Sequence, residues 1–251
     1  MKARPHTPKP VQRVLRQESG FGCASCGSPI LDYHHIIEWH DKQHFDPKHM
    51  IALCPTCHRH YGKMSKNKAY ALKQNPFNIR HKRFRGMLGG NGTQKALKIG
   101  NIHIESCRKC LVFGGMTLFN YKLEEGEFLL DVLVPKHDFW PDIKIEANDV
   151  FAEIQDYWDI EFKTNWVKFI KNKGEIFFEA DFRGDFVVVR GQLELLGGIF
   201  RFTRDGLELP NGSKLSAGTF KDCGTGLSFG PKRRIIPPNF AMQKPKPTYF
   251  G

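Results

Sequence analysis

The pattern of apolar and polar positions divides the chain into two unlike parts. The part beyond residue 95 contains 17 of the 21 phenylalanines, and many of its segments alternate apolar and polar residues. Such alternation, with Phe, Val and Ile enriched, is typical of half-buried β-strands, and Gly, Asn and Asp separate the segments as they do in turns. We expect strands over residues 97–105, 127–135, 143–154, 160–170, 175–182, 187–196 and 199–209.

Turns at this spacing predict a mostly antiparallel all-β domain over residues 96–230, and a sandwich, a barrel and an irregular solenoid all stay open as its form. The first part of the chain is mixed. Val11, Val14 and Leu15 have the i, i+3, i+4 spacing of a short amphipathic helix over residues 10–18, and residues 55–72 are expected to hold one or two helices. The predicted fold class is therefore α+β.

A Gly-rich stretch at residues 86–95 is the main candidate for a boundary between the two parts. We expect a basic arm and short helix over residues 1–18, a small domain with a basic extension over 19–90, and the all-β domain over 96–230. Residues 231–251 carry prolines and lysines without an apolar period, which predicts a disordered basic tail.

Composition places the chain among folded proteins and excludes wholesale disorder, since 40% of the residues are hydrophobic and 25% are charged. No apolar run approaches the roughly 20 residues that a membrane helix needs, and the first residues lack the apolar core of a signal peptide. We expect a cytoplasmic protein without a membrane partner, in which clustered cysteines indicate a metal rather than disulfides.

The formal net charge of +12 is unevenly distributed along the chain. Residues 1–95 hold 17 Lys and Arg against 5 Asp and Glu, whereas residues 96–230 hold 16 against 21. A basic first part favours a polyanion such as nucleic acid as the partner, over a charge that serves solubility alone. The residues predicted to contact phosphates, with a solvated charge run as the alternative, are Lys63, Lys66, Lys68, Arg80, Lys82, Arg83 and Arg85.

Four cysteines form two C-x-x-C pairs, Cys23 with Cys26 and Cys54 with Cys57, separated by 27 residues. Each pair can present two thiolates from a tight turn, and two such turns complete a tetrahedral sulfur site. Zn²⁺ is the expected occupant, as a structural ion in a segment with few large apolar residues. A third C-x-x-C at residues 107–110 has no matching pair, and we expect its cysteines to be ordinary reduced thiols.

The segment between the two cysteine pairs, together with the residues just after the second pair, holds more histidines than a structural zinc site requires. The run FGCASCGSPI…YHHIIEW…FDPKHMIALCPTCH, within residues 9–65, resembles the HNH endonucleases of the zinc-knuckle type, whose site is a ββα-metal fold. The resemblance implies that His35 is the general base that activates a water. It also implies that His34 and His58 hold the catalytic metal. His49 stands where the family usually has an asparagine that pins the loop or assists at the metal.

Phosphodiester hydrolysis agrees with these residue types. It needs an activated water, neutralised charge at phosphorus and help for the leaving oxygen, and an imidazole can accept a proton near neutral pH. A divalent ion held by imidazoles can clamp the phosphate, with Mg²⁺, Mn²⁺, Ni²⁺ and Zn²⁺ as candidates. The other histidines, among them His6, His40, His44, His81, His103 and His137, are expected to be ordinary surface or core residues.

The sequence thus predicts a metal-dependent endonuclease that acts on DNA, with RNA left open as a substrate, and with His34, His35, His49 and His58 at the site. The first alternative is an inactive zinc module that only binds nucleic acid, and His49 is its main support. The second is a nuclease gated by a protein or a small molecule that the acidic β-domain recognises.

Overall fold

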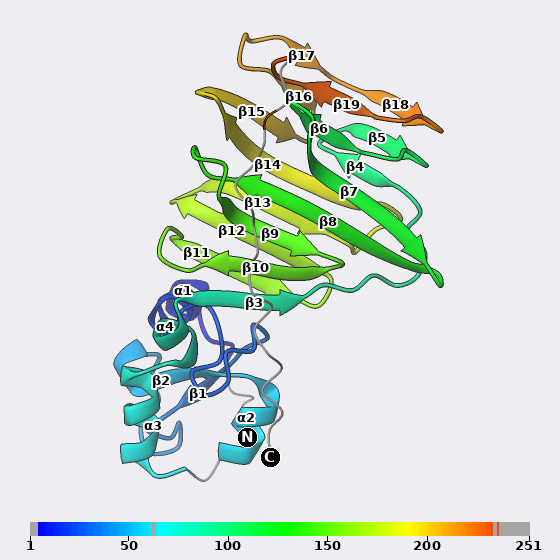
Figure 1. Ribbon diagram of the computed structural model, residues 1–251. Helices are drawn as coiled ribbons and strands as arrows, with labels where there is room; N and C mark the ends of the chain where they lie inside the picture. Colours follow the sequence, from blue (N-terminus) through cyan, green and yellow to red (C-terminus); the bar gives the residue numbers. More distant parts are fainter. Residues whose placement is uncertain (1–4, 62–63, 233–234, 236–251) are drawn as a thin grey trace.

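The structure is a computed structural model that describes residues 5–61, 64–232 and 235. Lys63 and most of the predicted tail, namely residues 233, 234 and 236–251, lie outside the described residues. Figure 1 shows a small helical module at one end of a larger β-domain. The α+β class is confirmed, and no helix of the described ranges is long and apolar enough to cross a bilayer.

The N-terminal module contains a ββα unit framed by three further helices. Strands β1 and β2 pair antiparallel, with Asp32 opposite Leu53 and His35 opposite Met50, and α2 follows directly. Of the one or two helices predicted over 55–72, the structure has two, α2 and α3. The elements are α1 (Lys9–Glu18), β1 (Asp32–His35), the 3-10 turn η1 (Pro47–His49), β2 (Met50–Leu53), α2 (Pro55–Tyr61), α3 (Lys66–Gln74) and α4 (Phe77–His81).

The β-domain consists of two sheets whose strands are mostly antiparallel. The first has the order β19-β6-β7-β8-β9-β10-β3, and the second runs from β11 to β17, with β4, β5 and β18 joined to it through β14. The first sheet contains β3 (Arg83–Met87), β6 (Leu111–Phe113), β7 (Met116–Glu124), β8 (Glu127–Pro135), β9 (Pro141–Glu146), β10 (Asp149–Glu153) and β19 (Leu227–Phe229). The second contains β4 (Leu97–Ile99), β5 (Ile102–Glu105), β11 (Asp159–Lys163), β12 (Trp166–Asn172), β13 (Glu175–Asp181), β14 (Val187–Leu195), β15 (Gly198–Thr203), β16 (Gly206–Glu208), β17 (Lys214–Leu215) and β18 (Gly218–Lys221).

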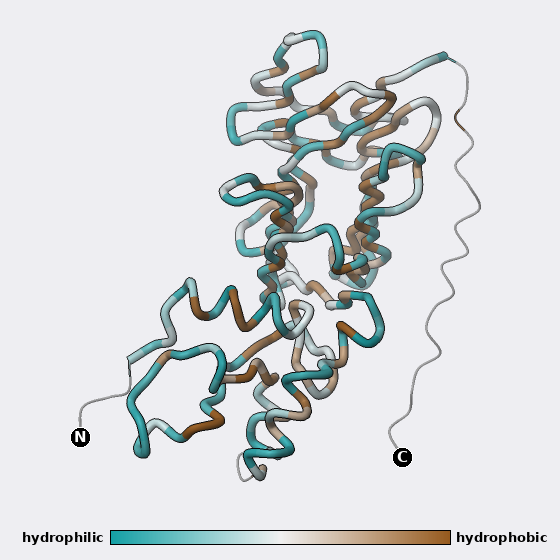
Figure 2. Tube along the Cα trace, turned by 90° about the vertical axis from the view of Figure 1, so that its left-hand side faces the viewer, coloured by the Kyte–Doolittle hydropathy of each residue, from teal (hydrophilic) through white to brown (hydrophobic). Residues whose placement is uncertain are grey.

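The two sheets pack face to face, so the domain is a sandwich. The ring of Phe119 on β7 lies 6.3 Å from Phe178 and 5.7 Å from Phe202, both on strands of the other sheet. Phe113 and Phe200 form a similar contact between the sheets. Figure 2 views the layers edge-on, with polar positions gathered at the turns. Aromatic side chains from alternate positions therefore fill the core, as the period-2 pattern predicts.

Several predicted strands are in fact hairpins with very short turns. The segment 143–154 forms β9 and β10, joined at Ala147 and Asn148, which both have positive φ. The buried Asn148 side chain donates to the carbonyl of Phe128 and accepts from the amide of Leu130. A two-residue turn keeps the apolar and polar alternation in step, which is why the pattern reads as one strand.

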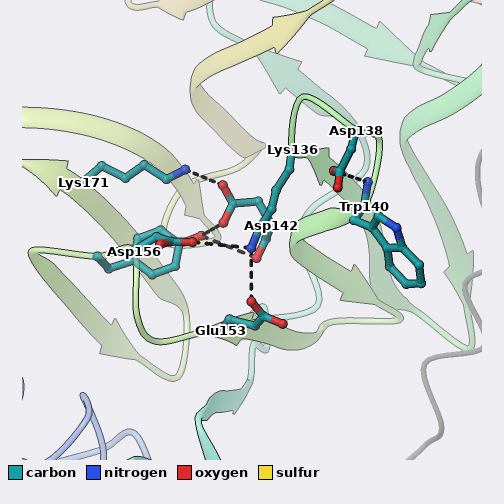
Figure 3. A network of polar contacts seen from close by, with 8 residues as sticks. Lys136, Asp138, Trp140, Asp142, Glu153, Asp156 and Lys171 are labelled. Atoms are coloured by element: carbon teal, nitrogen blue, oxygen red, sulfur yellow. Dashed lines mark hydrogen bonds and ion pairs between the residues drawn. The ribbon is translucent and has the colours of Figure 1, made fainter.

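One end of the sandwich holds a group of buried and half-buried charges (Figure 3). Asp142 on β9 is buried and accepts hydrogen bonds from the hydroxyl of Tyr157, at 2.6 Å, and from the ammonium of Lys171. Lys136 pairs nearby with Glu153 at 3.1 Å. Burial raises the pKa of Tyr157, so this phenol stays protonated and donates to Asp142. The group ties β9 of one sheet to β12 of the other.

The module and the sandwich meet at a buried ion pair. Arg16 on α1 donates from Nε and Nη2 to the two carboxylate oxygens of Asp159 on β11, at 2.9 and 2.6 Å. Its Nη1 donates to the hydroxyl of Tyr33 on β1 at 3.0 Å. Burial disfavours the charge of Arg16, but the hydrogen bond to Asp159 outweighs it, so the pKa of the guanidinium is raised. Arg13 also lies over the ring of Trp158, 4.2 Å from its centroid.

Residues 83–87, which the sequence analysis placed in the basic extension of the small domain, form β3 at the edge of the first sheet. Phe84 is fully buried and lies opposite Ala152 of β10. Arg83 and Arg85 point to the exposed face of the same strand. The alternation of cations with Phe84 and Gly86 is therefore a strand pattern within a basic run.

Replacing Asp159 with alanine should destabilise the protein, because it leaves Arg16 charged and largely buried without its partner. Breaking one side of a buried pair typically costs about 3–5 kcal/mol. Chemical unfolding followed by tryptophan fluorescence should show a clearly lower midpoint. Lys221→Ala, which breaks an exposed pair with Glu105, should leave the midpoint nearly unchanged. Equal midpoints for Asp159→Ala and the wild type would contradict this account.

Candidate metal centre and active site

The four cysteines of the two pairs meet at one point of the module. Their sulfur atoms all lie within 4.8 Å of one another, and Cys26 Sγ lies 3.7 Å from Cys54 Sγ. The first pair sits in a tight turn, in which the amide of Cys23 donates to the carbonyl of Ser28 and the carbonyl of Cys23 accepts the amide of Gly27. Gly27 has φ +79°, and a Cβ there would lie 2.5 Å from the side chain of Asn78. The turn therefore requires glycine at this position.

The donor set fits a zinc ion. Zn–S bonds of about 2.3 Å in a tetrahedron place sulfur atoms about 3.8 Å apart, close to the separation of Cys26 and Cys54. A hydrogen bond from Cys26 lowers the pKa of the Cys23 thiol to about 5, and the same contact raises the pKa of Cys26. One thiol of the pair is thus ready to act as a ligand at neutral pH. The predicted sulfur site is confirmed as a cluster that can hold zinc.

Two imidazoles from β1 and α2, with a carboxylate behind one of them, form a second candidate metal site. His34 Nδ1 lies 3.2 Å from His58 Nε2, and His58 Nδ1 lies 3.1 Å from a carboxylate oxygen of Asp32. Asp32 and His34 are two residues apart on a strand and therefore share one face, opposite α2. The side chains of His58 and Asp32 are 36% and 46% exposed, so solvent and substrate can reach them.

His35 belongs to a neighbouring group of rings in the loop between β1 and η1. It is 1% exposed, and its Nε2 donates to the carbonyl of His44 at 2.8 Å. Trp39, His44 and Phe45 pack around the imidazole with centroid distances of 4.9–5.9 Å. In the neutral tautomer that donates from Nε2, the lone pair lies on Nδ1. The loop thus fixes both the orientation and the tautomer of His35.

His44 and His49 hold this loop in place. His44 donates from Nε2 to the carbonyl of Ile37 and accepts the amide of Asp46 at Nδ1. His49 contacts the hydroxyl of Tyr70 on α3 at 2.7 Å, and its carbonyl accepts the amide of Ile36. The histidine at the position where the family usually has asparagine therefore makes contacts that pin the loop to α3.

The predicted phosphate-binding residues that the structure describes are all exposed, but they lie on different elements. Lys66 and Lys68 are on α3, and Arg80 is on α4. Lys82 follows α4 with φ +52°. Arg83 and Arg85 belong to the sandwich, where Arg85 pairs with Asp149 at 3.0 Å. Lys63 lies outside the described residues.

Sequence reasoning missed two polar partners of this site and underrated His44. Asp32 carries a signal that could have been used, because a carboxylate two residues before His34 on a strand shares its face. His44 was expected to be an ordinary imidazole, yet it supplies the carbonyl for His35 and braces the loop with its ring. Tyr70 has no local signal, since its contact with His49 depends on how α3 packs against the loop.

The third C-x-x-C does not act as a pair in the fold. Cys107 Sγ lies 2.8 Å from Cys223 Sγ, whereas Cys110 is fully buried and contacts the side chain of Asn120. All three are free thiols in the structure. They do not form a further metal cluster within the described ranges.

Replacing Cys54 with serine should remove the zinc, because one sulfur ligand and its short turn are lost. Native mass spectrometry should find one zinc per wild-type chain and none in Cys54→Ser. Circular dichroism of Cys54→Ser should retain the β-sheet signal of the sandwich. Cys223→Ser, a change far from the sulfur site in the sequence, should keep the metal. A wild-type chain without bound metal would refute the zinc assignment.

In the comparison with known proteins, only part of the module matches a family model. Residues 23–64 match the family model described as HNH endonuclease, a range that holds all four cysteines as well as His34, His35, His49 and His58. No curated protein and no solved structure matches the chain. The match and the sulfur cluster agree with the ββα arrangement of β1, β2 and α2. Residues 23–64 therefore resemble the HNH endonucleases, and their four cysteines form a possible metal site.

Proposed function

We propose that the protein is a metal-dependent endonuclease that hydrolyses phosphodiester bonds of DNA in the cytoplasm. The observation that carries the proposal is the pair of imidazoles of His34 and His58, 3.2 Å apart between ring nitrogens, with Asp32 bound behind His58. Two nitrogen ligands at about 2.1 Å from one ion lie about 3.0–3.4 Å apart in octahedral or tetrahedral geometry. This separation supports a shared divalent ion.

Asp32 supports the same assignment. A histidine that binds a metal usually donates its other ring N–H to a carboxylate, which fixes the tautomer and strengthens the ligand. His58 donates from Nδ1 to Asp32, so its Nε2 carries the lone pair and faces His34. His34 and His58 would hold a divalent ion there, which would supply charge neutralisation at the scissile phosphate and at the leaving oxygen.

His35 is the general base of the proposal. Its Nε2 donates to the carbonyl of His44, so Nδ1 is the atom that accepts the proton of the attacking water. The packed rings of Trp39 and Phe45 hold the imidazole in one orientation, which fixes the direction in which its Nδ1 points. His49 keeps the loop on α3 through Tyr70. An imidazole in place of the family's asparagine is therefore compatible with activity.

Substrate binding is assigned to the basic surface of the module. Lys66, Lys68, Arg80 and Lys82 are exposed cations on or beside α3 and α4, where they can neutralise phosphates without reading bases. Lys63 is kept in this set on its sequence position alone. The competing function, a zinc module that binds nucleic acid without cutting it, is an outcome of the experiment below.

Replacing His35 with alanine should reduce cleavage by about 10²–10⁴-fold, the usual contribution of a positioned general base. His58→Ala should also abolish cleavage, but excess Mn²⁺ or Ni²⁺ should restore part of it, because the lost group is a metal ligand. Plasmid cleavage with Mg²⁺, Mn²⁺, Ni²⁺ or EDTA measures both effects.

The matched control is His60→Ala, an exposed histidine on the same helix as His58, which should cleave like the wild type. Zinc content and DNA binding should be unchanged in all three variants. A zinc-loaded wild type that cuts neither DNA nor RNA with any of these metals would establish the binding-only module instead.

Replacing Asp32 with alanine should weaken the catalytic metal about 10–100-fold, as loss of a partner behind a histidine ligand typically does. The metal concentration needed for half-maximal cleavage should rise, with the rate at saturating metal changed less. Asp32→Asn keeps an oxygen acceptor and should lie between the two. If Asp32→Ala requires no more metal than the wild type, Asp32 has no role in positioning His58.

A further inference from the structure

The outer face of the second sheet carries a hollow of about 610 Å³, formed largely by β12 to β15. Three arginines line it: Arg190 on β14, Arg201 on β15 and Arg204 in the turn after β15. Arg201 lies opposite Gln192, two residues from Arg190 on the same strand, so Arg190 and Arg201 share one face of the sheet. Gly191 forms part of the floor and has φ +139°, a conformation open to glycine.

The side chain of Arg190 is 27% exposed, so its guanidinium is only partly buried. Its Nε is buried without a hydrogen-bond partner among the described residues. Its only recorded ion pair there is a long one, from Nη1 to Glu179 at 3.5 Å. The other oxygen of Glu179 accepts the indole N–H of Trp166 at 2.7 Å. A buried donor without a partner is unfavourable, and the long contact to Glu179 leaves the Arg190 guanidinium able to take a further acceptor.

Arg201 and Arg204 add exposed charge beside this donor. Neither forms an ion pair within the part of the chain that the structure describes, although most of the other cations of this sheet face do. Guanidinium groups present planar forks of N–H donors that match the oxygens of phosphates and carboxylates. Three of them around one hollow suit the higher charge of a phosphate.

The surroundings favour a small ligand over a long nucleic-acid strand. Residues 96–230 hold 21 Asp and Glu against 16 Lys and Arg, so the basic hollow lies on an acidic domain that repels an extended polyanion. Its volume falls within the range of about 300–1,000 Å³ typical of small-ligand sites. Ile176 also lines the hollow, and its exposed apolar side chain can pack against the nucleobase of a nucleotide.

We infer that this hollow binds the phosphate group of a ligand of nucleotide size, with Arg190, Arg201 and Arg204 as its anchors. The site lies on the sandwich and shares no residue with the metal site of the module. It does not depend on the proposed nuclease activity, and it assigns a ligand chemistry to the β-domain.

The test is calorimetric titration of the full chain with inorganic phosphate, pyrophosphate, AMP, ATP and a short single-stranded oligonucleotide. A dissociation constant below about 1 mM, a binding free energy of roughly −4 kcal/mol, is expected for at least one of the small phosphates. Arg201→Gln should weaken this binding about tenfold or more, since hydrogen bonds to charged groups contribute that much. Arg201 is exposed, so this variant keeps the fold; Arg190→Gln should weaken binding further.

Arg183→Gln is the matched control, because Arg183 lies outside the hollow and donates two hydrogen bonds to Asp181. This substitution should leave the affinity for the small phosphates unchanged. The inference is overturned if no small phosphate binds, or if Arg201→Gln binds as tightly as the wild type. It is also overturned if Arg183→Gln weakens binding as much as Arg201→Gln. Tighter binding of the oligonucleotide than of every small phosphate, through the same arginines, would replace the nucleotide-sized ligand with a nucleic-acid strand.

Discussion

The cluster of four sulfurs is the constraint on which the arrangement of the module depends. Few large apolar side chains are buried around it, with Ile36, Ile51 and Leu53 as the main ones. Such a core is too small to fix the strands and helices without a cross-link. Cys54 directly follows β2, and Cys57 lies on α2 directly before His58. A metal bound at the sulfur site would therefore also set the position of His58 relative to β1.

The contact between the module and the sandwich also bears on the candidate metal site. Arg16 binds Asp159 of β11 and, through its third nitrogen, the hydroxyl of Tyr33. Tyr33 lies on β1 between Asp32 and His34, the two residues that face α2. The strand that carries the candidate metal ligands is thus held from one side by the sulfur cluster and from the other by a carboxylate of the β-domain. The position of the module on the sandwich and the geometry of the candidate metal site therefore both depend on β1.

The sequence predicts best what repeats or what is spaced by chemistry. Two C-x-x-C pairs predict the sulfur site, and the segments of alternating apolar and polar residues predict most strands of the sandwich. Contacts between distant segments carry no such signal: Arg16 and Asp159 are 143 residues apart, and either could have been a solvated surface charge. The hairpin at Ala147 and Asn148 was not predicted because a turn of two residues preserves the alternation of apolar and polar positions. β3 was not predicted because two of its three outward positions are arginines, which made the strand resemble a basic extension of the small domain.

The edge strand β3 has a mechanical consequence for how this protein meets its substrate. Only Lys82 separates α4 from β3, and β3 is hydrogen-bonded along its length to β10. The Gly-rich stretch follows β3, so it is a loop that leads into β4 and not a tether between the two bodies. A stiff joint of this kind holds the sandwich at one angle to the module. A double helix bound on α3 and α4, as the proposed function would require, would meet the sandwich as a fixed wall and could approach only from directions that this wall leaves clear.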